Sequence, residues 1–319
     1  MPPGAILCFH GITSPRAPGR GEAHLSLPEF KAFIAAARRM GELVPLRELV
    51  ERHCDGRSTA GLVAITADDA YASLLTEATD YLAGEAIPLT VFVVTQATMG
   101  GARYWWDRVD DVFPLVSPER WRAFENACGV TEAYRRGQPA AYGPLRPFRQ
   151  WMLATHAGHW PAALEPELAR LELESGSEAA QRSMTLPELA RFAAFPAVDV
   201  GVHTLSHPVL PLLSDGDLKE EIAASYQILR EHFPSAVPIL ALPFGLFDAR
   251  TLAAAREAGM MASLTLAGTT LKRHAGRDDL PRFCLCRSDR PTRLRARLTG
   301  FFDRKAAAVR YPALPSATT

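Results

Sequence analysis

The chain has 319 residues, 48% of them hydrophobic, which is enough for one large α/β domain or two smaller ones with a sizeable core. Its 35 basic and 35 acidic residues cancel, and without a basic stripe the composition argues against a nucleic-acid-binding surface. No apolar run is long enough to span a bilayer, and the amino-terminal residues lack the features of a signal peptide. We expect a cytoplasmic protein with no transmembrane segment and no nucleic-acid partner, and the sequence leaves its oligomeric state open.

The amino-terminal part alternates predicted strands and helices. In chain order these are the strand Ala5–Phe9, a helix from the capping box Ser26–Glu29 to Met40, a helix over Leu46–His53, the strand Leu62–Thr66, a helix over Tyr71–Ala83 and the strand Ile87–Val94. The strands are continuous apolar runs rather than alternating ones. Such runs are typical of strands covered on both faces, as in a parallel sheet or barrel.

Residues 100–182 interrupt this rhythm and contain no clear strand. We interpret them as an insertion of helices and loops within one domain that spans residues 1–319. The insertion carries the aromatic run Tyr104–Asp107. These rings would either stack on a sugar in a lid or pack the insertion onto the rest of the domain.

Regular structure returns at a second capping box, Thr185–Glu188. The predicted elements that follow are the strand Val198–Val202, a helix over Ser214–Phe233, the strand Ile239–Leu242, a helix from Asp248 to Gly259, and the strands Ala262–Leu266 and Phe283–Leu285; residues 306–319 are expected to be a flexible tail. Polar or candidate site residues follow the carboxyl ends of several strands, which favours a barrel. These residues are His10, Asp68, Asp69, His203, His207 and Phe244.

Two histidines and two aspartates predict an open hydrolytic metal site. If the chain turns helically after Gly201, His203 and His207 lie on one helix face and reach one ion. Asp68 and Asp69 are adjacent carboxylates at the end of an apolar strand, where they need a cation or a hydrogen-bond network. The competing interpretations are two surface histidines at a helix start, and aspartates that cap the following helix.

The five cysteines are odd in number and scattered, which argues against a disulfide framework. Cys284 and Cys286 would lie on the same side of a strand. Because there is no CxxC spacing and no second pair, we interpret them as small buried residues rather than as a metal or redox pair.

Three motifs resemble those of the polysaccharide deacetylase superfamily, also called the NodB-homology or carbohydrate esterase 4 family. They are Thr66–Ala70, His203–Pro208 and Leu242–Gly245, in this order. Leu7–Ile12 and Trp105–Arg108 also resemble segments of its cytoplasmic-type members. The resemblance implies an α/β fold, a distorted (β/α)7 barrel, and a divalent metal, most often Zn²⁺.

The resemblance also implies roles for single residues. Asp69, His203 and His207 would bind the metal, and Asp68 would be the general base. The backbone N–H of Phe244 would help to stabilise the oxyanion.

Three features of the sequence depart from the family pattern. Ala67 and Ala70 stand where Phe and Gly are common. The arginine that orients the base is missing ahead of the third motif, and Arg282 is a hypothetical substitute. The late histidine that acts as general acid has no convincing match, since His274 lies in a polar loop, so His10 is the substitute acid that we consider, with capping or core use as the alternative.

The implied activity is metal-dependent hydrolysis of an N-acetyl or other N-acyl group on an amino sugar or glycoconjugate, in surface polysaccharide metabolism. The alternative is a catalytically silent relative that binds a glycan or a partner protein. The missing arginine and late histidine motivate this alternative.

Overall fold

The protein is described from a computed structural model, which covers residues 1–15, 19, 21–136, 145–176, 181–271, 276–301 and 303. Its strands are β1 (Ala5–Phe9), β2 (Ile12–Thr13), β3 (Leu25–Ser26), β4 (Glu42–Leu43), β5 (Leu62–Ala67), β6 (Leu89–Val93), β7 (Val198–Val202), β8 (Ile239–Ala241), β9 (Ala262–Thr265), β10 (Leu280–Pro281) and β11 (Phe283–Cys284). β2 and β3 form a small separate sheet. All seven predicted apolar runs overlap strands of the main sheet.

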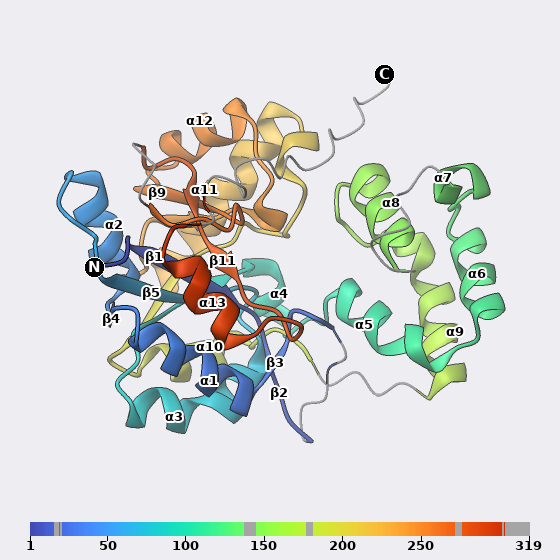
Figure 1. The fold of residues 1–319 in the computed structure, drawn as a ribbon. Helices are drawn as coiled ribbons and strands as arrows, with labels where there is room; N and C mark the ends of the chain where they lie inside the picture. Colours follow the sequence, from blue (N-terminus) through green and yellow to red (C-terminus); the bar gives the residue numbers. More distant parts are fainter. Residues whose placement is uncertain are drawn as a thin grey trace.

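The main sheet is parallel and almost closes into a barrel (Figure 1). Its strands follow the order β10-β9-β8-β7-β6-β5-β1-β11, with β4 beside β5. The two end strands are consecutive in the chain, because β10 pairs with β9 and β11 pairs with β1. Arg282 lies between them, and its N–H donates to the Thr265 carbonyl at 3.1 Å. One extended segment therefore joins both edges of the sheet, as expected for a distorted (β/α)7 barrel.

Helices cover the outside of this sheet and form a group of their own on one side of it (Figure 1). Their bounds are α1 (Leu27–Arg38), α2 (Leu46–Cys54), α3 (Thr79–Gly84), α4 (Thr95–Gly100), α5 (Trp105–Val112), α6 (Pro118–Ala127), α7 (Glu132–Arg136), α8 (Arg146–His156), α9 (Glu165–Ser175), α10 (Leu186–Ala193), α11 (Asp215–His232), α12 (Ala249–Glu257) and α13 (Pro291–Leu298). Both predicted capping boxes are present, at Ser26 and Thr185. The helix expected over Tyr71–Ala83 is instead a π-helical turn, Leu74–Ala78, followed by α3.

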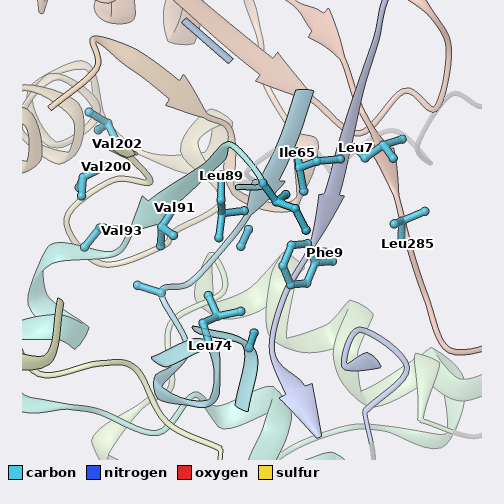
Figure 2. Packing of buried hydrophobic residues seen from close by; sticks show 14 of the residues in the cluster. Leu7, Phe9, Ile65, Leu74, Leu89, Val91, Val93, Val200, Val202 and Leu285 are labelled. Atoms are coloured by element: carbon cyan, nitrogen blue, oxygen red, sulfur yellow. The ribbon is translucent and has the colours of Figure 1, made fainter. Parts of the chain in front are cut away.

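Side chains alternate between two buried clusters along the strands, which explains the continuous apolar runs. Figure 2 shows the outer cluster, in which Leu7, Ile65, Val91 and Val200 pack beneath the helices. Ile6, Ala64 and Phe92, their neighbours in the chain, belong to the inner cluster, which α2 residues such as Leu49 complete. At the carboxyl ends of the strands, the same alternation directs polar side chains into the barrel.

Helices α5 to α9 form the segment predicted as an insertion. They share a separate aromatic core around Phe148, with Trp105, Trp121 and Trp151. They stand beside the barrel in Figure 1. The predicted tail, residues 306–319, and His274 lie outside the described residues.

None of the described helices has the length and apolarity that crossing a membrane would require.

Candidate active site

Three candidate metal ligands meet beyond the carboxyl ends of β5 and β7. Asp69 Oδ1 lies 3.6 Å from His203 Nε2 and 3.7 Å from His207 Nε2. All three side chains are buried, and their ligand atoms lie within 4.8 Å of one another. One carboxylate and two imidazoles, converging from different strands, are a ligand set typical of zinc hydrolases.

The two histidines converge through a loop, and the helical turn predicted after Gly201 is wrong. Residues Thr204 and His207 have left-handed backbone angles, with φ of 68° and 63°. Glu221 of α11 holds the loop, because its carboxylate accepts from the N–H groups of Leu205 and Ser206 at 3.0 and 2.9 Å. The rings reach each other at a centroid distance of 4.7 Å without a helix.

The aspartate end of the site also depends on unusual backbone angles. Asp69 and Ala70 both have positive φ, 69° and 48°, directly after β5. An alanine tolerates this conformation at a cost of about 1–2 kcal/mol, whereas glycine does so freely. Ala70 therefore adopts, at some cost, a conformation that favours the glycine that the resemblance led us to expect at this position.

The polar atoms of this cluster are suited to a cation. His203 Nδ1 lies 2.8 Å from the Ala241 carbonyl, so Nδ1 carries the hydrogen and Nε2 offers a lone pair. Asp69 Oδ1 is buried without a hydrogen-bond partner among the described residues. Burial and the Asp68 charge raise the pKa of Asp69 well above its ordinary value. A bound cation would give Asp69 Oδ1 a partner and would stabilise the ionised carboxylate. The residues present therefore fit a divalent metal.

Arg282 lies where the sequence hypothesis needed it, on Asp68. Its guanidinium donates two hydrogen bonds to the carboxylate, from Nη1 to Oδ1 at 2.7 Å and from Nη2 to Oδ2 at 2.9 Å. Arg282 is fully buried, and its guanidinium lies 5.4 Å from the centroid of the Phe92 ring. Burial raises the pKa of Asp68, but the guanidinium outweighs burial and holds it well below its usual range. Asp68 is therefore an ionised carboxylate at neutral pH.

His10 and Phe244 lie on the rim of the same site. Burial lowers the pKa of the His10 imidazole to about 4, against the opposing charge of Asp68. Phe244 has a φ of 57°, and its ring lies 4.6 Å from that of His207. The structure thus brings all of the predicted site residues together: Asp68, Asp69, His10, His203, His207, Phe244 and Arg282.

Sequence reasoning missed a buried network that ties the insertion to this site. Asp107 of α5 accepts from Tyr71 at 2.6 Å and lies 2.7 Å from His24 Nε2. His24 Nδ1 in turn accepts from the Gly11 N–H at 3.2 Å, so Nε2 carries the ring hydrogen. Tyr104 donates to the Asp69 carbonyl at 2.9 Å. The signal in the sequence was Asp107 itself, a carboxylate beside two tryptophans that needs buried donors.

The tryptophans of the predicted aromatic run have different positions. Trp105 is buried in the insertion core, and its Nε1 donates to the Gly158 carbonyl at 2.8 Å. Trp106 is half-buried, stacks on Tyr104, and lies 4.8 Å from the His207 ring. Packing therefore accounts for Trp105, whereas Trp106 is part of the wall beside the candidate metal ligands.

Comparisons with known proteins give one family match and several similar folds. A family model described as polysaccharide deacetylase matches residues 147–263. The fold is similar to IcaB from Ammonifex degensii, with a TM-score of 0.60, 18% identity, and coverage of 94% of this chain and 98% of that one. It is also similar to the Streptococcus pyogenes deacetylase PplD in complex with acetate, with a TM-score of 0.57, 15% identity, and coverage of 92% and 97%.

A third similar structure is the de-N-acetylase from Aggregatibacter actinomycetemcomitans, with a TM-score of 0.56, 12% identity, and coverage of 92% and 98%. At these identities the likeness concerns the fold. No curated protein sequence gives a significant match.

Proposed function

We propose that the chain, in which residues 147–263 match a family model described as polysaccharide deacetylase, is a metal-dependent hydrolase of this family. It removes an N-acetyl or other N-acyl group from an amino sugar or glycoconjugate. The observation that carries the proposal is the pairing of two units, the Asp69–His203–His207 cluster and the Asp68–Arg282 ion pair beside it. One unit suits a metal, and the other holds an ionised carboxylate ready to accept a proton.

Asp69, His203 and His207 would hold a divalent ion, with Zn²⁺ as our proposal, which would supply Lewis-acid polarisation of water and of the amide carbonyl. Asp68 accepts the proton of the attacking water, and Arg282 keeps this carboxylate ionised and oriented. The backbone N–H of Phe244 would stabilise the developing oxyanion. His10 donates a proton to the leaving amine nitrogen.

The family match and the wall of the site support this substrate class. Trp106 offers a half-buried aromatic side chain beside His207, which suits stacking on a sugar ring. In a cytoplasmic setting, a small or activated glycoside is a better substrate than an assembled polymer. A role in the assembly of surface polysaccharides is part of this proposal.

One observation favours the alternative, a silent relative that binds a glycan or protein. With a pKa of about 4, His10 is almost entirely neutral at pH 7, so little of the protonated form that could donate is present. If no other group donates, the rate falls by the ~10²–10⁴-fold that acid–base catalysis contributes.

The variant Asp68→Asn separates the two functions. We expect it to lower hydrolysis of N-acyl amino sugars by about 10²–10⁴-fold, because the base is lost. Metal content by elemental analysis should stay near one equivalent, because the three ligands remain. A His203→Ala, His207→Ala double variant is the control, and it should lose the metal.

The hydrolase proposal fails if the metal-loaded wild-type protein turns over no N-acyl sugar at a rate above that of Asp68→Asn. The silent relative then becomes the better description, and binding of the same sugars, measured by calorimetry, would test it. Loss of metal in Asp68→Asn would instead reassign Asp68 as a ligand.

A further inference from the structure

A second group of ligand-type side chains lies inside the barrel where β1 meets β11. Cys8 and Cys284 are register partners across these two strands. His10 follows Cys8 by two residues, so both side chains point to the same face of β1. The ligand atoms of Cys8, His10 and Cys284 lie within 4.8 Å of one another. This group shares no residue with Asp69, His203 and His207.

The polar atoms of this second group are largely unused. His10 Nδ1 is buried and has no hydrogen-bond partner among the described residues. The Cys8 thiol is fully buried and makes long contacts, at 3.3 Å to Asp68 Oδ2 and 3.7 Å to the Phe9 carbonyl, besides its contact with the Cys284 thiol. A buried imidazole nitrogen without a partner costs about 1–3 kcal/mol, so the group is better satisfied with a ligand than without one.

The chemistry of the donors differs between the two clusters. Two thiols and one imidazole are a soft set, whereas Asp69 and its histidines combine a hard carboxylate with borderline nitrogens. Two thiolates favour soft, thiophilic ions such as Cu⁺ more strongly than a site built on a carboxylate does. Binding a divalent ion would release both thiol protons, so the ion and two thiolates together add no net charge beside Arg282.

We propose that Cys8, His10 and Cys284 form a second metal site, selective for a soft ion. The sequence drew attention to Cys284 and Cys286 as a pair; in the fold the Cys284 thiol contacts those of both Cys286 and Cys8, and its ligand atom also lies near that of His10. An ion at this site occupies His10 and lies against Asp68. If the proposed hydrolase function holds, occupancy of the second site therefore inhibits it.

The test uses Cd²⁺ as the probe and reduced full-length protein. The His203→Ala, His207→Ala variant removes the first site, so that the second is measured alone. We expect one equivalent of Cd²⁺ with the ultraviolet charge-transfer band of a cadmium thiolate. Cys8→Ser and Cys284→Ser, each added to this variant, should abolish the band. Cys128→Ser, a buried cysteine in the insertion core, is the matched control and should keep it.

His10→Gln provides a variant that leaves both thiols in place. It should weaken Cd²⁺ binding at least ~10-fold. Even a residue that only hydrogen-bonds to a metal ligand usually changes metal affinity by this much, and His10 is a proposed ligand itself. The proposal is overturned if the band survives in Cys8→Ser or Cys284→Ser, or if Cys286→Ser abolishes it while Cys8→Ser does not.

A second arm tests the inhibition. Cd²⁺ added to the zinc-loaded wild-type protein should slow hydrolysis, and the Cys284→Ser enzyme should resist it. Equal inhibition of both enzymes would overturn the regulatory part and leave the binding result standing. If the wild type has no hydrolytic activity, the proposed function fails, and the cadmium band still decides the second site.

Discussion

Arg282 shows how much one residue can contribute in this protein. Its backbone joins the two ends of the sheet, and its side chain forms a bidentate ion pair with Asp68. Both partners are buried, so removing one leaves an uncompensated charge and costs about 3–5 kcal/mol of stability. The same pair keeps the proposed base ionised.

Arg282→Lys tests this role through pH. Lysine keeps the positive charge but cannot donate two parallel bonds, so the pKa of Asp68 should rise. The base works only when ionised, so activity is lost as the pH falls through its pKa. With a raised pKa this loss begins at a higher pH, and the acid limb of the kcat/KM profile shifts upward.

A matched control is Arg297→Lys. Arg297 stacks on Phe283, with 4.8 Å between its guanidinium and the ring centroid, and should leave the acid limb unchanged. An unshifted limb in Arg282→Lys would mean that Arg282 is structural only.

At the scale of elements, β7 depends on a side chain of the neighbouring strand. Gly201 faces the barrel interior, and a Cβ added there would lie 2.6 Å from the Phe92 ring. The same ring lies beneath the Arg282 guanidinium. The glycine in β7 thus makes room for a ring from β6, and the ring helps to position the partner of Asp68.

Gly201→Ala should lower the free energy of unfolding by about 1–3 kcal/mol, the usual cost of overpacking. Phe92→Leu removes the ring edge that clashes, so the double variant should lose less than the sum of the two single losses. Urea unfolding of the four proteins measures this coupling. Gly216→Ala, in the first turn of α11 with no atom nearer than 3.9 Å, should be neutral or slightly stabilising.

At the scale of the whole molecule, Asp107 joins the helical insertion to the loops that carry the site. It contacts His24, which accepts from the Gly11 N–H beside His10, and Tyr71, which follows the Asp68–Asp69 pair. These three side chains are almost fully buried. The insertion therefore supports the loops after β1 and β5 directly.

Asp107→Asn should weaken this support. Asparagine offers one acceptor oxygen where the carboxylate offers two, so one buried donor loses its partner at a cost of about 1–3 kcal/mol. Hydrogen exchange at Gly11 and Ile12 should speed up, and the unfolding free energy should fall. Asp278→Asn breaks an exposed pair with Arg256 and should change stability by less than about 1 kcal/mol. Unchanged exchange at Gly11 would contradict the supporting role.

Much of the fold and site was accessible from the sequence because the signals are local. Continuous apolar runs predicted seven strands of the main sheet, and strand-end polar residues predicted the side chains that cluster beyond it. The helical turn between His203 and His207 was wrong, because the loop is held by Glu221 of α11, a contact that spacing does not encode. The network of His24, Tyr71 and Asp107 was missed for the same reason.

The sequence by itself determined the periodicity, the caps and the residue types, since each depends on neighbours along the chain. Only the tertiary structure decided which distant side chains meet. Asp68 and Arg282 are 214 residues apart and pair because the last strand joins both edges of the sheet. Cys8 and Cys284 become neighbours through the same junction. Barrel closure is a long-range property, so the partners that it creates can be read only from the folded chain.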